Sequence, residues 1–394
     1  MLEIPENESI VDIKKRQMRN DIIQYVYFSG ATAISTFSKS LNSSIPSVTA
    51  TINELVKEDW LIEIGSKKIK TGRKPTLYDL NEDKHCVLVI DINLYETRLC
   101  LINLKNKVLQ IESSPFSITN NQEYVAKLTN KIAEFLQKQQ VQPWAIGISF
   151  PGLVDNKTGI NSTYVNLNQG KKSLAEHLQQ SFGFKVFTLN DTKATLIGEH
   201  HFGLAKDKKH VLLVNLDWGI GLGVLANGEL LQGASGFAGE LGHIQIQPNG
   251  ELCHCGKTGC LETLASASTL LKNAKKGLQN GRASKLSTLG DNITVEAIIE
   301  FAIEGDEFSI DLLYEIGKEL GKGLALAVNL FNPEIIIIDG IMTNAGNLLT
   351  NAIEQSINKY CLSDFKNNLE VLISPIGEMA KIYGVKSYVF GEML

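Results

Sequence analysis

The sequence predicts a multidomain chain with two parts: a mainly α-helical winged helix-turn-helix at the N-terminus, and a larger α/β part built from two lobes. Two observations predict this division. Apolar stripes at helical spacing are followed by two short β-rich runs around a basic loop. Beyond them, strands and helices alternate to the end of the 394-residue chain. The expected boundaries are residues 1–82 for the N-terminal domain and 83–394 for the α/β domain.

Three short consecutive helices are expected in the N-terminal domain. Their apolar stripes fall at residues 22–27, 34–41 and 48–56. Gly30 separates the first two helices, and Pro46 suits the first turn of the third helix, because no backbone N–H is needed there. This spacing is typical of a helix-turn-helix.

Two strands, at residues 60–64 and 75–80, are expected to enclose a basic loop as a wing. The segment 65–75, like the run at 14–19, concentrates positive charge in a chain of net charge −5, which indicates a polyanionic partner. Winged modules place the third helix in the major groove of double-stranded DNA. The residues expected near bases or phosphates are Ser44, Pro46, Ser47, Thr49, Ala50, Asn53, Arg73 and Lys74. A winged helix that contacts another protein is the alternative.

The α/β domain is expected to form two similar lobes, with the ligand site in the cleft between them. Lobe one spans about residues 83–195 and includes the C-terminal helix, whereas lobe two spans about 196–380. A long apolar helix around residues 309–330 belongs to lobe two. The expected strands are 87–92, 97–102, 145–150 and 186–189 in lobe one, and 211–216, 221–225 and 335–338 in lobe two.

Composition predicts neither export nor membrane insertion. The first residues contain no apolar signal segment, and no stretch of about eighteen residues lacks both charge and glycine. The six cysteines are unlike a secreted disulfide framework, since three cluster in one segment while Cys86, Cys100 and Cys361 are scattered. A cytoplasmic protein is therefore expected.

One segment, residues 239–262, reads GELGHIQIQPNGELCHCGKTGCLE and contains one histidine and three cysteines at spacings that suit a single metal ion. The expected ligands are His243, Cys253, Cys255 and Cys260. Thiolate and imidazole are preferred ligands of Zn²⁺, and a closed set of four is structural rather than catalytic. The alternatives are buried free cysteines without a metal, and competition from His254, which ranks lower because it directly neighbours another ligand.

This segment resembles the signature of the ROK family, which comprises repressors, sugar kinases and uncharacterised open reading frames. The resemblance extends from about residue 84 to the end of the chain and implies the ribonuclease-H-like architecture of sugar kinases and actin. It also implies that the metal-bound histidine, two glutamates and an Asn-Asp pair contact a sugar. The matching residues are Asn190, Asp191, Glu240, His243 and Glu262, with Asn166 as a weaker candidate. Carboxylates and imidazole are strong partners for vicinal hydroxyls. For each glutamate alone, the alternative is a solvated surface residue.

Kinase activity is not expected, although Asp191 matches the family's catalytic base. Phosphoryl transfer needs glycine-rich loops whose backbone N–H groups hold the nucleotide phosphates. Active members resemble Asp-x-Gly-Gly-Thr in the first loop, whereas residues 91–95 here carry bulky side chains. Residues 217–221 replace a Gly-Thr-Gly opening by Asp-Trp-Gly-Ile-Gly, and the adenosine-side Gly-Gly is reduced to Asp-Gly at 339–340. No catalytic residue is therefore expected.

The sequence thus predicts a sugar-responsive transcriptional regulator from the repressor branch of the ROK family. Its expected partners are a double-stranded DNA operator near carbohydrate uptake or catabolism genes, and a sugar or sugar-phosphate effector that changes the orientation of the DNA-binding domains. Reading of half-sites favours a homodimer or homotetramer. Two alternatives stay open: an ATP-dependent sugar kinase with an added DNA-binding module, and a regulator controlled by a protein partner.

Overall fold

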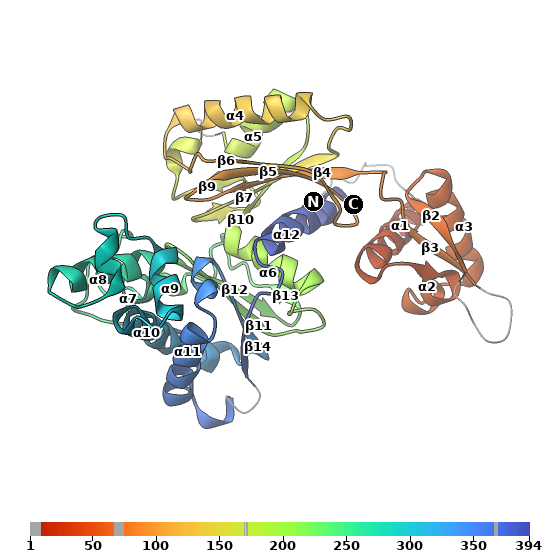
Figure 1. The fold of residues 1–394 in the computed structure, drawn as a ribbon. Helices are drawn as coiled ribbons and strands as arrows, with labels where there is room; N and C mark the ends of the chain where they lie inside the picture. Colours follow the sequence, from red (N-terminus) through yellow and green to blue (C-terminus); the bar gives the residue numbers. More distant parts are fainter. Residues whose placement is uncertain (1–8, 67–74, 169, 171, 366–368) are drawn as a thin grey trace.

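A computed structural model describes residues 9–66, 75–168, 170, 172–365 and 369–394, and the expected wing residues Arg73 and Lys74 lie outside these ranges. The N-terminal helices pack around a small sheet, and two larger α/β lobes follow (Figure 1). The predicted architecture, a winged helix-turn-helix joined to a two-lobed α/β part, is therefore confirmed. Within the described ranges, none of the helices is both long enough and apolar enough to cross a bilayer.

The N-terminal part contains the expected helix-turn-helix. Its elements are α1 (Ile10–Ser29), β1 (Thr32–Ala33), α2 (Ile34–Ser40), α3 (Ile45–Lys57), β2 (Leu61–Ser66) and β3 (Thr76–Leu80), with the strands in the order β1-β3-β2. The prediction of a short first helix was wrong, because α1 has 20 residues and includes the basic run. No helix-breaking residue interrupts it after Ser9, whose Oγ accepts a hydrogen bond from the Asp12 N–H at 3.2 Å. It ends at Gly30, where φ is +74°.

Two residues of the basic run at 14–19 form ion pairs within the N-terminal domain. Lys15 forms an ion pair with Glu54 at 2.7 Å, and Arg19 forms one with Glu58 at 2.6 Å. The first pair joins α1 to α3, and the second joins α1 to the residue that follows α3, both above a shared apolar core. These two positive charges are therefore partly neutralised within the domain. The fully buried members of this core include Ile22, Phe37, Val48, Ile52, Leu55 and Leu61.

Lobe one is built on a five-stranded sheet covered by helices on both faces (Figure 1). Its strands are β4 (Cys86–Ile92), β5 (Thr97–Asn103), β6 (Val108–Ser114), β7 (Ala145–Phe150) and β10 (Val186–Asn190), in the order β10-β7-β4-β5-β6. The alternation along β4 explains the layers. Leu88 and Ile90 pack in a core with α4 (Gln122–Gln137) and α5 (Leu174–Phe182). Val87 and Val89 pack in another with α6 (Asp191–Phe202) and α12 (Glu378–Met393), so the C-terminal helix returns to lobe one as predicted.

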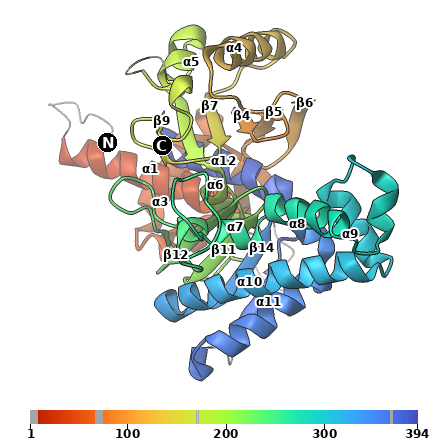
Figure 2. The same ribbon diagram turned by 90° about the vertical axis from the view of Figure 1, so that its left-hand side faces the viewer.

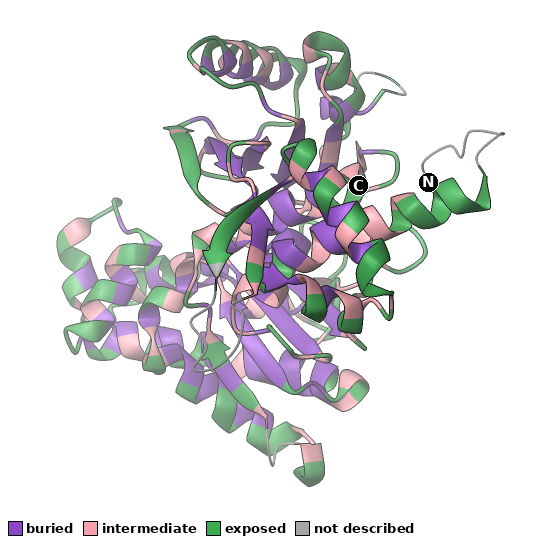
Figure 3. Ribbon diagram, turned by 90° about the vertical axis from the view of Figure 1, so that its right-hand side faces the viewer, coloured by how far each residue is buried: buried purple, intermediate pink, exposed green. Residues whose placement is uncertain are grey.

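Lobe two repeats this plan on a second five-stranded sheet. Its strands are β11 (Val211–Leu216), β12 (Ile220–Ala226), β13 (Glu229–Leu230), β14 (Ile335–Asp339) and β15 (Glu370–Ile373), in the order β13-β12-β11-β14-β15. Its helices are α7 (Glu262–Ala265), α8 (Ala267–Gln279), α9 (Val295–Ile303), α10 (Glu307–Phe331) and α11 (Asn347–Tyr360). Helices α10 and α11 lie side by side in both views (Figures 1 and 2). The three central strands of this sheet, β12, β11 and β14, are mostly buried, whereas the start of α1 is exposed (Figure 3).

Shorter elements connect these layers. They are β8 (Val154–Asp155), β9 (Ile160–Asn161), η1 (Val165–Leu167), η2 (Leu241–His243), η3 (Lys285–Leu289), η4 (Ile341–Ala345) and η5 (Ser363–Phe365). Helix α6 has a special place, because its residues contribute to the cores of both lobes: Ala194 packs with lobe one and Leu196 packs with the sheet of lobe two. The two lobes therefore meet on α6.

Helices α6 and α12 pack so closely that glycine is required on each of them, at Gly198 on α6 and at Gly384 on α12. A Cβ on Gly384 would lie 1.8 Å from the Ala194 carbonyl oxygen. We expect Gly384→Ala to destabilise the fold by about 1–3 kcal/mol or more, because backbone atoms would have to move apart. Urea unfolding measures the effect. Gly391→Ala on the same helix is the matched control, since nothing lies within 4 Å of its added Cβ. Equal stability of the two variants would contradict the required contact.

Candidate functional site

The histidine and three cysteines predicted as metal ligands converge on one point. One donor atom from each of His243, Cys253, Cys255 and Cys260 lies within 4.8 Å of the others. The Cys253 Sγ lies 3.6 Å from the His243 Nδ1, and the Cys255 and Cys260 Sγ atoms are 3.6 Å apart. Zn–S and Zn–N bonds of about 2.3 and 2.0 Å in a tetrahedron require donor separations of about 3.5–3.8 Å. The donor set is therefore compatible with one structural zinc ion.

Glycines determine the shape of this segment, which we call the cysteine knuckle (residues 243–260). The Cys253 N–H donates to the Lys257 carbonyl oxygen at 2.7 Å and closes a tight turn at Gly256, where φ is +86°. At Gly259 a Cβ would lie only 1.6 Å from the Gln247 carbonyl oxygen, so no larger residue fits. The backbone therefore brings the sulfurs together.

His254 takes part in a second, overlapping group. Its Nδ1 lies 2.9 Å from the Glu262 Oε1 and 3.8 Å from the Cys253 Sγ. Donor atoms of His243, His254 and Glu262 also lie within 4.8 Å of one another. His254 is exposed and is paired with a carboxylate, whereas the His243 ring directly contacts a buried thiol. His243 is also the histidine that groups with all three cysteines, whereas His254 groups with His243 and Glu262, which favours His243 as the fourth ligand.

Two of the expected sugar-binding glutamates lie beside the knuckle. Glu262 begins α7 just after Cys260 and is buried, and its Oε2 accepts a hydrogen bond from the Ile220 N–H at 3.1 Å. Glu240 immediately precedes η2 and is exposed. The Glu240 carboxylate interacts electrostatically with Lys193, Asp191 and Glu262. The knuckle and the start of α6 are therefore neighbours.

Asn190 and Asp191 mark the point where β10 ends and α6 begins. The Asn190 Oδ1 caps the helix by accepting from the Lys193 N–H at 3.1 Å, and its Nδ2 donates to the Gly152 carbonyl oxygen at 3.1 Å. The Asp191 Oδ1 accepts from the Thr192 N–H at 2.7 Å. Burial raises the pKa of Asp191, although Lys381 acts in the opposite direction.

Asn166, the weaker candidate for sugar binding, forms its hydrogen bonds with Asn120 instead. Its N–H donates to the Asn120 Oδ1 at 2.8 Å, and its Nδ2 donates to the Asn120 carbonyl oxygen at 3.0 Å. The residue is exposed. Nothing in these contacts links Asn166 to the other five residues.

In the first glycine-poor loop, residues 91–95, the side chain of Asn93 is hydrogen-bonded to the backbone of the loop. The Asn93 Oδ1 accepts hydrogen bonds from the N–H groups of Tyr95 and Glu96 at 2.8 and 2.9 Å. The Tyr95 hydroxyl then donates to the Asp217 Oδ1 at 2.6 Å, which joins the loops of the two lobes. Two backbone donors that could face a phosphate are therefore already paired, and a carboxylate lies beside them.

Comparison with known proteins decides the family. A model described as the ROK family matches residues 87–390. The chain belongs to the ROK family.

Two repressors resemble most of the chain. The N-acetylglucosamine repressor NagC of Escherichia coli, described as a dual regulator, is 31% identical over 339 residues, which cover 85% of this chain and 83% of NagC. The xylose repressor of Caldicellulosiruptor bescii is 30% identical over 363 residues, which cover 91% of each chain.

A solved regulator structure matches a larger share of this chain than a solved kinase structure does. A ROK family transcriptional regulator, described as a homolog of the E. coli MLC protein, superposes with a TM-score of 0.82 at 29% identity, covering 96% of this chain and 97% of that one. A ROK family glucokinase from Streptomyces griseus, solved with glucose and AMPPNP, has a TM-score of 0.68 at 26% identity, covering 77% of this chain and 98% of the glucokinase. The kinase match thus leaves about a quarter of this ROK chain uncovered, while the regulator match spans nearly all of it.

The part of this ROK protein expected to contact DNA is largely solvent-accessible. Ser44, Pro46, Ser47, Ala50 and Asn53 on and before α3 are all exposed. Thr49 is only half-buried, and its hydroxyl donates to the Ile45 carbonyl oxygen at 2.8 Å. Ser44 caps α3 with its Oγ, which accepts from the Ser47 N–H at 3.4 Å.

Lys381 was not predicted from the sequence, although it lies among the aspartates of this ROK protein. Its Nζ lies 3.6 Å from the Asp91 Oδ1. Burial alone would lower the pKa of Lys381, but Asp91, Asp191, Asp217 and Asp339 together hold it above its usual value. These aspartates come from both lobes, whereas Lys381 lies on the last helix. No local pattern in the sequence marks the lysine, since only the fold brings these groups together.

Proposed function

We propose that this ROK protein is a sugar-responsive repressor of carbohydrate uptake or catabolism genes. Residues 1–82 would bind operator DNA, and residues 83–394 would bind a sugar or sugar phosphate. The observation that carries the proposal is the combination of an exposed α3 in a helix-turn-helix with a sugar-kinase-like fold whose first phosphate loop is filled by Asn93. The regulators that match nearly the full length of the chain support the same function.

For DNA binding, we assign the exposed face of α3 to the major groove and the wing to phosphates. The assigned residues are Ser44, Pro46, Ser47, Thr49, Ala50 and Asn53 of the helix-turn-helix, with Arg73 and Lys74 of the wing. The hydroxyl and amide side chains can read base edges, whereas the cationic pair supplies sequence-independent attraction. A homodimer or homotetramer would present two such helices to paired half-sites.

For sugar binding, we assign the residues around the start of α6 and the knuckle. They are Asn190, Asp191, Glu240, His243 and Glu262. Carboxylates accept hydrogen bonds from vicinal hydroxyls, and an imidazole whose Nδ1 faces a metal keeps its Nε2 for a hydroxyl. A Zn²⁺ ion held by His243, Cys253, Cys255 and Cys260 would supply rigidity, since a closed four-ligand site leaves no position for a reacting water.

Phosphoryl transfer is not part of the proposal. Asp191 matches the base of the family's kinases, but the N–H groups of Tyr95 and Glu96 are paired with Asn93. Asp217 would also oppose a nucleotide phosphate by like charge. The alternative of a sugar kinase with a DNA-binding module rests on the likeness to the glucokinase structure. Saturable binding of ATP, followed by calorimetry, would favour that alternative.

Selection of genomic DNA fragments by the purified full-length protein tests the proposed function. We expect specific fragments at physiological salt, released by one member of a panel of N-acetylglucosamine, xylose, glucose and their phosphates. Absence of any specific fragment would overturn the repressor function. Specific fragments that no sugar releases would instead favour control by a protein partner.

The wing provides a separate prediction. Arg73→Ala combined with Lys74→Ala should weaken binding to all DNA sequences alike and lower the salt slope, log Kd against log salt, by about one for each phosphate interaction removed. Fluorescence anisotropy over a range of salt concentrations measures this slope. Lys275→Ala with Lys276→Ala on exposed α8 is the matched control for net charge. A slope equal to that of the control would exclude phosphate binding by the wing.

A further inference from the structure

A fully buried lysine lies where α1 meets the rest of the protein. Lys386 on α12 is 0% exposed, and its Nζ donates to the Leu104 carbonyl oxygen at 3.1 Å and to the Asn106 side-chain oxygen. Among the residues that the structure describes, no carboxylate lies within 4.0 Å of this ammonium. Burial lowers its pKa well below the usual value, whereas the two oxygens that accept its hydrogen bonds favour the charged form. Such a residue is costly to bury, so its contacts with neighbouring elements need an explanation.

Two aromatic rings complete the environment of Lys386, and they come from different parts of the chain. Its Nζ lies 4.5 Å from the ring centre of Tyr27 on α1 and 5.0 Å from that of Phe202, the last residue of α6. Cation–π attraction is strongest for desolvated cations. The Tyr27 ring also stacks on Phe390 at 3.9 Å, and its hydroxyl is 2.9 Å from the Ser387 Oγ. Tyr27 of the DNA-binding part therefore contacts α12 through Lys386, Ser387 and Phe390, and the lysine also contacts the end of α6.

Helix α6 connects this point to the proposed sugar site. It begins at Asp191 and ends at Phe202, so its 12 residues span about 18 Å. Its contact with α12 is tight, because a Cβ on Gly198 would lie 1.8 Å from the Ala380 carbonyl oxygen. A helix packed in this way moves as a rigid body. We therefore expect a shift of its first turn to reach its last residue.

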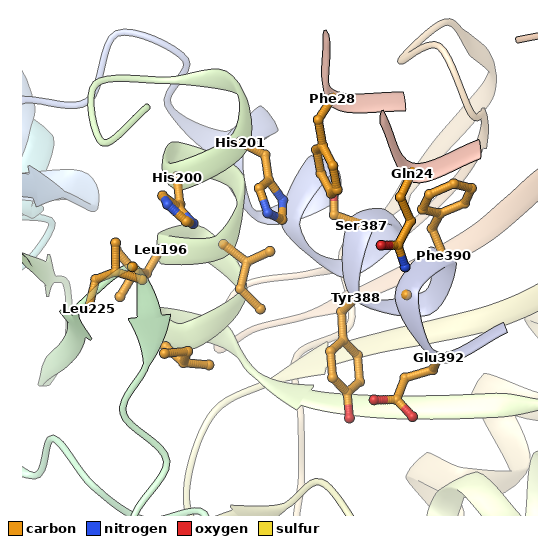
Figure 4. A pocket seen from close by; sticks show the side chains of 14 residues that line it. Gln24, Phe28, Leu196, His200, His201, Leu225, Ser387, Tyr388, Phe390 and Glu392 are labelled. Atoms are coloured by element: carbon orange, nitrogen blue, oxygen red, sulfur yellow. The ribbon is translucent and has the colours of Figure 1, made fainter. Parts of the chain in front are cut away.

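A cavity of about 310 Å³ lies beside this junction, between residues of α1, α6 and the end of α12. At its border the rings of Phe28 and His201 are 4.4 Å apart. Phe28 of α1 and His201 of α6 border it, with Ser387 and Tyr388 of α12 (Figure 4). The His201 Nδ1 is buried without a hydrogen-bond partner. Helix α1 therefore has unfilled space next to the contacts of Lys386.

We propose that Lys386 is the positioning residue that couples the sugar site to the DNA-binding helices. Its ammonium binds the Tyr27 ring to the Phe202 ring, so that movement of α6 on sugar binding carries α1 along. The cavity supplies the second arrangement that such a switch requires. This inference rests on the proposed function, because it concerns the link between its two binding sites.

Lys386→Met tests the coupling, since methionine keeps most of the length of the side chain without its charge. The sugar used is the one among N-acetylglucosamine, xylose and glucose, free or phosphorylated, that releases DNA from the wild type. The measured quantity is the operator Kd with this sugar divided by the operator Kd without it. Couplings of this kind are typically about 5- to 150-fold, and we expect the ratio to fall to within about twofold of one. Sugar binding measured by calorimetry without DNA should persist. A ratio equal to that of the wild type would overturn the proposal.

Two further variants separate coupling from stability. Val389→Ala, on the same helix, removes buried methyl groups that face Gly147 of the lobe-one sheet, so it should lower stability but keep the ratio. Phe202→Leu removes one ring from the lysine and should reduce the ratio. Equal ratios in Phe202→Leu and Val389→Ala would count against the lysine contact.

If the wild type binds no operator, the proposed function is refuted. Hydrogen exchange can then still test whether Lys386 holds α1. Amides of residues 22–29 should exchange at least about tenfold faster in Lys386→Met than in Val389→Ala, because the last turns of α1 lose their attachment. Identical exchange in the two variants would show that Lys386 does not hold α1.

Discussion

Replacing Cys255 with serine is expected to reduce the zinc content from one ion per chain to a small fraction, and to weaken sugar binding on the order of 10- to 100-fold. Cys255 is exposed, so its replacement leaves no cavity in the core. The effect instead follows from the metal, because a three-ligand knuckle holds zinc poorly and metal binding is coupled to local folding. His243 and Glu262 depend on this fold for their positions, since one is a proposed ligand and the other follows the last cysteine closely.

Elemental analysis and sugar titration of the same preparation measure both effects. Cys361→Ser is the matched control, because Cys361 lies outside the knuckle and is half-buried. Removal of the metal from the wild type by a chelator should reproduce the Cys255→Ser phenotype. A demonstrably metal-free protein with a full sugar response would contradict a structural role for the ion.

Asp191→Asn is expected to produce a repressor that binds DNA but no longer releases it. A hydrogen bond to a charged group contributes about 1.5–3 kcal/mol, so sugar affinity should fall roughly 10- to 150-fold. Asp191 starts α6, and its carboxylate interacts with Thr192 and Lys381 of the α/β part, so operator affinity without sugar should stay unchanged. Calorimetry and operator titration measure the two quantities.

Asp339→Asn is the matched control for charge. Both carboxylates act on Lys381, so each variant removes one negative charge from the same lysine. Only Asp191 belongs to the proposed sugar set. An equal fall in sugar affinity in the two variants would mean that the electrostatics of Lys381, and not a hydroxyl hydrogen bond, explains the effect.

The protonation of Asp191 adds a pH dependence to the same experiment. Because burial raises the pKa of Asp191, the carboxylate that accepts hydroxyl hydrogen bonds is protonated at a higher pH than an ordinary aspartate. Sugar affinity of the wild type should therefore fall as the pH is lowered through this raised pKa. In Asp191→Asn this component of the pH profile should be missing.

Local patterns predicted much of the fold. The strands at β4, β5, β7, β10, β11, β12 and β14 are expected from short apolar runs, and each lies in one of the two large sheets. The knuckle is also predictable, because its ligands are close in sequence and its glycines permit the turns. The length of α1 is not, since its first turns are polar or exposed and show no apolar stripe.

Contacts between distant residues could not be predicted in this way. Lys386 lies between buried Val385 and Val389 on α12, yet a lysine in a helical pattern indicates a solvated face. Its partner Leu104 is 282 positions away. The Tyr95–Asp217 hydrogen bond likewise joins residues 122 positions apart. Sequence spacing contains no information about such pairs when a single sequence is read. The assignments of individual residues to sugar and DNA remain predictions for the experiments above.

With Asn93 in its first loop, the proposed sensor would respond to sugar independently of ATP. The amide oxygen of Asn93 accepts hydrogen bonds from two N–H groups of the loop, so under the proposed function the protein would not follow ATP levels. A sensor of this design reports on the presence of a nutrient and not on the energy state of the cell. Gene expression would then respond to the sugar in starving and well-fed cells alike, and any adjustment to energy supply would have to come from another regulator at the same promoters.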